Sequence, residues 1–316
     1  MKKKQQIKVG TRKSALAMWQ TEHVIELLKE KNDNLEFIVV PISTKGDKIL
    51  DVPLAKIGDK GLFTKELEVA LINREIDFAV HSVKDMPTKL PEGLKLGAMT
   101  KRHNPQDAFV AANNIKFTDL PKGATIGTSS LRRRAQLLKF RPDLNLVDIR
   151  GNLQTRLKRM KEQNLDGIIL AAAGLERLGM EEHITDYLDF SICLPAVGQG
   201  SLAIEIREND SYIENLVRSI NDEETEIAIR AERALLRDFE GGCQIPIGAQ
   251  GRIENGSMIL EALVASLDGR TLIRDNLTGD IKEPETIGIK LASLLRSAGA
   301  GKILEEIRLG EAKHNE

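Results

Sequence analysis

The chain has 316 residues, 41% of them hydrophobic and 29% charged, so it is long enough for two or three globular domains. Its 46 basic and 47 acidic residues leave a net charge of −1, which argues against binding of nucleic acid or a membrane surface through bulk charge. Aromatic residues make up 3%, too few for repeated base-stacking platforms, and two cysteines, Cys193 and Cys243, cannot form a disulfide framework.

The N-terminal sequence, MKKKQQIKVG, has three lysines but no apolar segment after them, so it does not resemble a secretory signal. The most apolar stretch, 167–175, is far too short to span a membrane. The five histidines have no spacing typical of metal ligands. We therefore expect a protein of a reducing, cytoplasmic compartment, without a metal, a nucleic-acid partner or a membrane partner.

Strand-like and helix-like segments alternate in the first two thirds of the chain. Apolar residues at helical spacing, among them Leu16, Trp19 and Leu27, predict a first helix, and Thr64 is the predicted cap of another. This alternation predicts an α/β protein with mainly parallel sheets covered by helices. The predicted strands are 7–10, 35–42, 78–81, 94–99, 125–127, 144–149 and 167–171, and two further helices are predicted at 131–140 and 153–163.

The segment 45–61 is rich in Lys, Asp and Gly, and we interpret it as one long loop. A mobile lid and a solvated connection would both have this composition. The sequence alone favours the solvated connection.

The pattern changes after residue 220. A long helix is predicted at 223–239, followed by strands at 247–253, 258–267 and 271–278 that are separated by the turn dipeptides Asn255-Gly256 and Asp268-Gly269. Two helical patterns end the chain. This order predicts a separate α+β domain of about 95 residues.

Four strand ends carry polar or basic residues directly before a turn or helix. In open α/β sheets, ligands bind beyond the carboxyl ends of the strands, where helix N-termini offer free N–H groups. Arginine adds planar recognition of carboxylate or phosphate. Together these segments predict a cleft for a polyanion between two lobes. They are VGTRKS (9–14), VHSVKD (80–85), IGTSSLRR (126–133) and DIRGN (148–152).

The region 132–159 has nine basic residues and two acidic ones, an imbalance that is local in a nearly neutral chain. For any single arginine here, an ordinary solvated helix face is the better explanation. Taken jointly, Arg132, Arg133, Arg150 and Arg156 favour an anion site, because they stand at predicted strand ends or in first helix turns.

Two further residues have both a structural and a functional interpretation. Asp85 is an acid beside Lys84 in a turn that should face the basic cleft, where it could stabilise a cationic intermediate, although alone it reads as a turn aspartate. Cys243 follows two glycines in FEGGCQIPIG, but a single cysteine is more often a small buried hydrophobe. We interpret Cys193 and His81 as core residues, and 198–200 as a hinge or a turn.

These motifs, in this order, resemble one family over nearly the whole chain: porphobilinogen deaminase, also called hydroxymethylbilane synthase. Each motif alone is weak, whereas the ordered set is specific. The motifs are GTRKSALAMWQ, STKGD, GDKGLFTKELE, HSVKDMPT, GTSSLRRRAQL, DIRGNLQTRL, AAAGLERLG, LPAVGQG and EGGCQIPIG.

The resemblance implies a transferase of haem and other tetrapyrrole biosynthesis. It would join four porphobilinogen molecules head to tail into hydroxymethylbilane and release ammonia. It also implies two lobes like those of periplasmic binding proteins, with mainly parallel mixed sheets, and a C-terminal α+β domain. The implied boundaries are 1–103 with 198–219, then 104–197, then 220–316. A monomer is expected.

By the same resemblance, Cys243 would hold a dipyrromethane cofactor through a thioether bond and Asp85 would be the catalytic acid. Each pyrrole carries acetate and propionate groups, which would explain the concentration of arginines. The cofactor-binding positions would be Lys84, Ser130, Arg132, Arg133 and Arg156. The substrate-binding positions would be Arg12, Ser14, Gln20, Arg150, Arg156 and Arg177.

The chain departs from the family pattern at Asn104 and Gln106, where many members have an acid and an arginine, and at Ala15, which replaces a frequent proline. We expect the first two to alter a contact between domains and the third to loosen a helix start. Two other classes stay open. A two-lobed binding protein for an anionic solute would share the cleft without needing Cys243, and an arginine-mediated nucleic-acid binder is disfavoured by charge and aromatic content.

Overall fold

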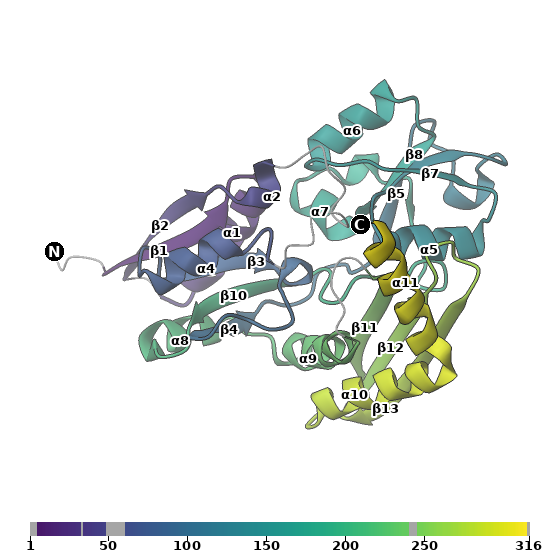
Figure 1. Cartoon of the computed structure of the whole chain (residues 1–316). Helices are drawn as coiled ribbons and strands as arrows, with labels where there is room; N and C mark the ends of the chain where they lie inside the picture. The colour runs from purple at the N-terminus through teal and green to yellow at the C-terminus, as the bar shows by residue number, and fades with distance from the viewer. Residues whose placement is uncertain (1–4, 33, 49–60, 240–244, 315–316) are drawn as a thin grey trace. The chain divides into compact units, whose positions relative to one another are not determined.

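The computed structural model describes residues 5–32, 34–48, 61–239 and 245–314 (Figure 1). The chain divides into two compact units. Described residues up to 103, together with 200–226, form the first unit, and 104–199 with the described residues from 227 onward form the second. The predicted second domain, 104–197, and the described part of the predicted third domain from 227 onward therefore lie in one unit. The three-domain boundaries stay a prediction.

The first unit is built on a five-stranded mixed sheet. Strands β2, β1 and β3 pair in parallel. Strand β10, which the chain forms after it returns from the second unit, pairs antiparallel with both β3 and β4. The strand order is β2 (Leu35–Ile42), β1 (Gln5–Arg12), β3 (Phe78–Ser82), β10 (Leu202–Arg207) and β4 (Leu94–Met99).

Helices cover both faces of this sheet. One hydrophobic core joins the strands to α1 (Ala15–Lys29) and α8 (Ser211–Arg218), and a second core joins them to α4 (Lys65–Ile72). Successive residues of β3 alternate between the two cores: Phe78 packs in the first and Ala79 in the second. Burial on both faces is why these strands are nearly continuous apolar runs.

The second unit contains a five-stranded mixed sheet of the same plan. Strands β6, β7 and β8 are parallel, and β5 and β9 extend the sheet in antiparallel pairing. Its core on one face includes α5 (Leu131–Phe140), and on the other face α6 (Leu153–Glu162) and α7 (Ala172–Arg177). The strand order is β7 (Asn145–Val147), β6 (Thr125–Gly127), β8 (Gly167–Ala171), β5 (Asp107–Ala111) and β9 (Asp186–Tyr187).

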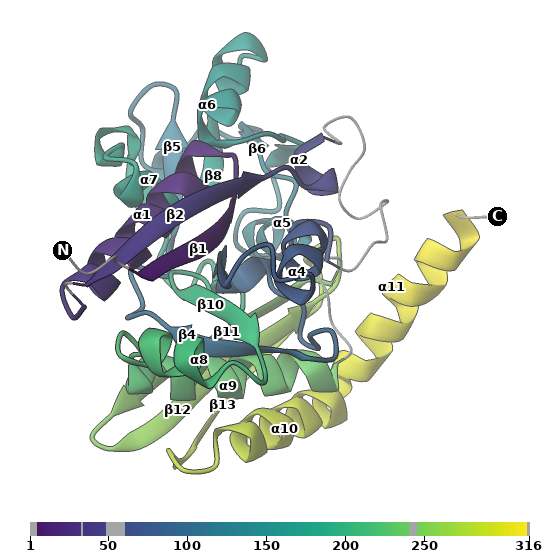
Figure 2. The ribbon, with the colours of Figure 1, turned by 90° about the vertical axis from the view of Figure 1, so that its left-hand side faces the viewer.

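The second unit also holds a three-stranded antiparallel sheet and its helices (Figure 2). The turn between β11 and β12 is Asn255-Gly256, and both residues have positive φ, 51° and 74°, as the two-residue hairpin turn requires. A single core joins this sheet to α9 and to the C-terminal helices. These elements are β11 (Ile247–Glu254), β12 (Ser257–Ala265), β13 (Leu272–Asp280), α9 (Glu223–Asp238, in this unit from 227 onward), α10 (Pro284–Leu295) and α11 (Gly301–His314).

The observed architecture is the predicted one, two α/β sheets followed by an α+β part, and the bounds of β4, β6, β8 and α5 are those expected from the sequence. Three strands were missed: β5, β10 and the two-residue β9. Strands β5 and β10 each contain a fully buried acid, Asp107 or Glu205, whose charge interrupts the apolar pattern of a strand. Glu205 lies 3.0 Å from Nε2 of His81, which is the buried core histidine that the sequence predicts.

Three local predictions need correction. The segment 45–61 is not a loop throughout, because Lys45–Lys48 forms the short helix α2; the remainder up to 60 lies outside the described residues. Thr64 does precede α4, but its hydroxyl donates to the Glu68 carboxylate at 2.7 Å instead of capping the helix. The first helix buries Ala17, Gln20, Thr21, Val24, Ile25 and Leu28, a face displaced by one residue from the predicted one.

Candidate functional site

In the second unit, the carboxyl ends of the parallel strands lead into helix N-termini. Strand β6 is followed by α5, whose first turn is capped by Ser130: its Oγ accepts from the Arg133 N–H at 3.5 Å. Strand β7 leads to α6, where the Asn152 side chain accepts from the Thr155 N–H at 2.8 Å. The predicted residues Ser130, Arg132, Arg133 and Arg156 therefore all stand at helix starts beside the same edge of one sheet.

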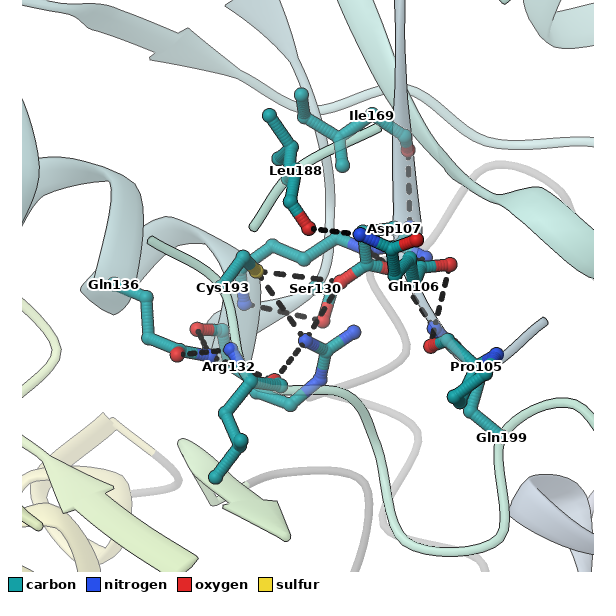
Figure 3. Close-up of polar contacts among 12 residues, drawn as sticks. Pro105, Gln106, Asp107, Ser130, Arg132, Gln136, Ile169, Leu188, Cys193 and Gln199 are labelled. Atoms are coloured by element: carbon teal, nitrogen blue, oxygen red, sulfur yellow. Dashed lines mark hydrogen bonds and ion pairs between the residues drawn. The ribbon is translucent and has the colours of Figure 1, made fainter. Parts of the chain in front are cut away.

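A buried ion cluster lies at the start of α5 (Figure 3). Arg132 donates from Nη1 to Oδ2 of Asp107 at 2.8 Å and to the Leu194 carbonyl at 2.7 Å. Arg133 donates from Nη2 and Nε to Oδ1 of the same carboxylate, at 2.7 and 3.1 Å. Each arginine is 6% exposed and Asp107 is 0% exposed.

One carboxylate in this cluster faces two guanidinium groups. Burial by itself would raise the pKa of Asp107, but Arg132 and Arg133 outweigh burial and hold that pKa far below its usual range, so the carboxylate is ionised. The three side chains together keep one formal positive charge. Because an uncompensated charge in a buried place is costly, this arrangement favours an added anion.

Three more predicted arginines supply cationic groups in this unit. Atom Nη1 of Arg150, in the loop after β7, is buried and has no hydrogen-bond partner among the described residues. Arg156 donates from Nε to the Gly151 carbonyl at 2.8 Å in the first turn of α6. Arg177, the last residue of α7, is 7% exposed; burial lowers its pKa to about 10, and Glu176 opposes this only in part.

Three of the other basic residues of the region 132–159 match the solvated-face explanation. Arg134 lies 4.0 Å from Asp148, Arg141 pairs with Asp143 at 2.7 Å, and Lys158 pairs with Glu162 at 3.4 Å along α6. Such surface ion pairs contribute little stability and leave little charge for a ligand. The structure thus separates the buried arginines of the region from its surface pairs.

In the first unit, Arg12 ends β1 and Ser14 caps α1, accepting from the Ala17 N–H at 3.3 Å. The Arg12 guanidinium pairs with Asp47 and lies 4.3 Å from the centre of the Phe63 ring. Burial would raise the pKa of Asp47, but the hydrogen bond and charge of Arg12 keep it lowered. Arg12 therefore already has a carboxylate partner within its own unit.

The residues after β3 form the short helix η1 (Val83–Asp85), which carries Lys84 and Asp85. The Val83 N–H donates to the Ser201 carbonyl at 3.1 Å and fixes this turn to the end of β10. Gln20 of α1 donates to the Ser82 hydroxyl at 3.0 Å, directly beside it. Asp85 is half-buried, and within the described ranges its carboxylate takes part in neither a hydrogen bond nor an ion pair.

The predicted site residues thus fall into two groups, one on each unit. Arg12, Lys84 and Asp85 stand at strand ends of the first unit, with Ser14 and Gln20 at the start of and within α1. Ser130, Arg132, Arg133, Arg150, Arg156 and Arg177 stand on the second unit. The predicted cleft between lobes concerns the placement of one unit relative to the other and stays a prediction. Cys243 lies outside the described residues.

Two residues that the structure brings to this site were missed by the sequence analysis, Asp107 and Gln199. Gln199 donates from Nε2 to Oδ1 of Asp107 at 2.9 Å and to the Pro105 carbonyl at 2.7 Å. It stands between Gly198 and Gly200, which have φ of 71° and 93° and so form the tight turn foreseen as one interpretation of 198–200. In the sequence, Asp107 is distinguished only as an acidic residue directly before a short apolar run.

Cys193 is fully buried, as predicted, but its thiol is not simply an apolar filler. Its Sγ lies 3.2 Å from Oδ2 of Asp107 and 3.4 Å from Nη1 of Arg132. Burial and the Asp107 charge raise the pKa of this thiol to about 12. A thiol with that pKa stays protonated at neutral pH and is a poor nucleophile.

Two of the three departures from the family pattern, Asn104 and Gln106, make hydrogen bonds in the structure. Asn104 donates to Glu176 at 3.0 Å and accepts from the Gln106 N–H at 3.0 Å, and the Gln106 side chain donates to the Leu188 carbonyl at 3.2 Å. These contacts lie within the second unit. Helix α1 begins at Ala15 with its Ser14 cap in place.

None of the helices in the described ranges is both long and apolar enough to cross a membrane. Two family models match the chain: "Porphobilinogen deaminase, dipyromethane cofactor binding domain" over residues 7–215, and "Porphobilinogen deaminase, C-terminal domain" over residues 226–297.

Two relatives named porphobilinogen deaminase match over nearly full length. The protein of Carboxydothermus hydrogenoformans is 57% identical over 96% of this chain and 98% of its own length. That of Desulforamulus reducens is 55% identical over 98% and 100%.

Among solved structures, a TRAP periplasmic solute binding protein from Desulfovibrio salexigens matches at 11% identity. It covers 70% of this chain and 73% of its own, with a TM-score of 0.42. The periplasmic aliphatic sulphonate binding protein of Escherichia coli matches at 14% identity over 75% and 71%, with a TM-score of 0.40.

Proposed function

The chain belongs to the porphobilinogen deaminase family, and we propose that the residues at the strand ends of its two units carry out that family's reaction. The enzyme joins four porphobilinogen molecules head to tail into hydroxymethylbilane and releases ammonia, a step of tetrapyrrole biosynthesis. Every substrate unit brings an acetate and a propionate group, so the growing product is a polyanion. A monomeric state and a cytoplasmic location stay predictions of the sequence.

The observation that carries this assignment of residues is the surplus of buried cationic groups in the second unit. Arg132 and Arg133 share one carboxylate, and Nη1 of Arg150 is buried without a described partner. Carboxylates of a pyrrole chain would supply the missing acceptors through charge-assisted hydrogen bonds. A neutral ligand would leave these groups uncompensated.

The same residues fit the dipyrromethane for which the matching family model is named. We assign its carboxylates to Ser130, Arg132, Arg133, Arg156 and Lys84, and its thioether bond to Cys243. When bound, this group supplies a terminal pyrrole whose free α-carbon accepts the first substrate unit. The protein side chains hold it by covalent attachment and by charge, so no single arginine bears its whole attachment.

Asp85 is assigned the electrostatic role in the reaction. Positive charge develops on a pyrrole as ammonia leaves, and the pyrrole N–H needs an acceptor. The Asp85 carboxylate is half-buried, and it is free of ion pairs within the described ranges, so it can accept that hydrogen bond. Its place in η1, anchored by the bond from Val83 to Ser201, keeps it oriented.

Six residues are assigned to the substrate and the growing chain: Arg12, Ser14, Gln20, Arg150, Arg156 and Arg177. Arg12 would have to exchange or share its Asp47 partner when it binds a substrate carboxylate. Gln20 is held by Ser82, which places its amide beside the turn that carries Asp85. These assignments rest on the match of the six positions to the family's motifs and on side-chain chemistry; Gln20 lies within α1, and Arg177 ends α7.

The decisive test of the function is turnover of porphobilinogen by the purified protein. We expect one ammonia released per porphobilinogen consumed and a linear tetrapyrrole as product, measured by ammonia assay and by mass spectrometry. A binding protein for anionic solutes would retain porphobilinogen without releasing ammonia. Binding without ammonia release would contradict the proposed function.

Replacing Arg132 with Leu should cause apo-protein to accumulate. The variant loses one guanidinium of the pair that holds cofactor carboxylates, and a ligand that binds only the folded state stabilises it, so the apo form should melt at a lower temperature. Intact-mass spectrometry gives the fraction that carries the adduct. Arg134→Leu, on the same helix but in a surface ion pair, is the matched control and should keep the adduct. A fully loaded Arg132→Leu protein would contradict the assignment.

A further inference from the structure

The shared carboxylate of Asp107 has no part in the function described so far. We propose that Asp107 is a positioning residue, which holds Arg132 so that one edge of its guanidinium is ready for a carboxylate of the pyrrole chain before that chain binds. This inference rests on the proposed function of Arg132. It assigns to Asp107 an effect on ligand binding that goes beyond stability of the fold.

The Asp107 carboxylate is a fixed template. Oδ2 accepts from Nη1 of Arg132 at 2.8 Å, with the Cys193 thiol at 3.2 Å. Oδ1 accepts from Nη2 of Arg133 at 2.7 Å and from Nε2 of Gln199 at 2.9 Å. With both oxygens occupied and no exposed surface, the carboxylate cannot turn without breaking several hydrogen bonds.

The two arginines use this template differently. Arg133 donates from Nε and Nη2 to Asp107. These two atoms form the edge of a guanidinium that can bind a carboxylate through two hydrogen bonds. The remaining nitrogen, Nη1, donates to the Ile169 carbonyl at 3.0 Å. Arg132 is held through Nη1 alone, by Asp107, Cys193 and the Leu194 carbonyl. Its Nε and Nη2 donate to none of the described residues, so Asp107 anchors one end of this guanidinium and leaves the forked edge for a ligand.

Holding the guanidinium in advance matters because a free arginine side chain has many rotamers. If binding of the ligand had to fix one of these rotamers, the arginine side chain would lose conformational entropy and the ligand would bind more weakly. The Asp107 anchor removes that loss beforehand. The remaining positive charge of the cluster then draws the anionic group to the edge that is already oriented.

The test must separate this effect from the ordinary cost of a broken buried ion pair. Asp107→Asn keeps the shape and removes the charge, and Asp107→Glu keeps the charge but moves it by one methylene. Asp143→Asn is the matched control, because Asp143 also pairs with an arginine of the second unit, Arg141, at 2.7 Å but away from the cluster. Each protein is prepared as apo-protein from cells that make no porphobilinogen, and is then loaded with porphobilinogen.

Two quantities are measured for each variant: the porphobilinogen concentration that gives half-maximal adduct by intact mass, and the difference in thermal midpoint between loaded and apo forms. We expect Asp107→Asn to raise the half-loading concentration about tenfold or more, as for a misplaced binding group, and to shrink the difference in midpoint. A merely structural role would lower both midpoints equally and leave their difference unchanged, and that result would overturn the inference. The Asp143→Asn control should leave both quantities at wild-type values.

If Asp107→Asn does not fold, Asp107→Glu decides the question, because it retains the charge that compensates the arginines. It should fold and still need a higher concentration for loading; loading like the wild type would overturn the inference. The proposed function fails separately, if wild-type apo-protein takes up no adduct at all. If the wild type takes up the adduct and the Asp107 variants load at the same porphobilinogen concentration as the wild type, the positioning role of Asp107 is contradicted and the proposed function is not.

Discussion

Replacing Asp85 with Asn should lower turnover of porphobilinogen by about 10²–10³-fold while the cofactor stays attached. The variant keeps the shape of the side chain and removes the charge that stabilises the developing cation. The attachment depends on Cys243 and on the arginines, so the loss of one carboxylate in η1 should not release the group. Turnover is measured with the loaded fraction checked by intact mass.

Two companion variants make the Asp85 experiment specific to electrostatics. Asp85→Glu keeps the charge one methylene further out and should retain partial activity. Glu22→Gln removes an exposed carboxylate from α1 of the same unit and should leave turnover unchanged. If loaded Asp85→Asn turned over at the wild-type rate, Asp85 would be an ordinary turn aspartate.

Replacing Cys243 with Ser should abolish both the adduct and all but trace turnover. A thiol has a reactive thiolate fraction at neutral pH, whereas an unactivated serine hydroxyl has essentially none, so no covalent bond to a pyrrole should form. Intact-mass spectrometry of wild type and variant measures the loss directly. The apo-protein should also melt at a lower temperature, because it lacks a ligand that stabilises the folded state.

The second cysteine provides the control for this experiment. Cys193 is buried and burial holds the pKa of its thiol at about 12, so it should not carry the group. Cys193→Ala should therefore retain the adduct. If Cys243→Ser kept the adduct mass of the wild type, or if only Cys193→Ala lost it, the cofactor would be attached to a residue other than Cys243.

Much of the fold and of the candidate site could be predicted because it depends on patterns within short segments of the sequence. Alternation of strand and helix patterns predicts the carboxyl ends of parallel strands, and α5 begins where the sequence predicts it, directly after such an end. The Asn255-Gly256 turn needs positive φ at both residues, which these two residue types adopt readily. Periodicity and turn chemistry are local, so they are visible without a structure.

Only the tertiary structure decided which charges face each other. Asp107 and the arginines of α5 are 25 and 26 residues apart in sequence, and they meet because β5 pairs with β8 in the sheet whose neighbouring strand β6 leads into α5. Arg132 and Arg134 look alike in the sequence, yet one is buried against Asp107 and the other lies near Asp148 at the surface. The sequence determined where cations gather, and strand order and burial determined which of them a ligand can use, because the cost of an unpaired charge depends on surroundings that distant parts of the chain supply.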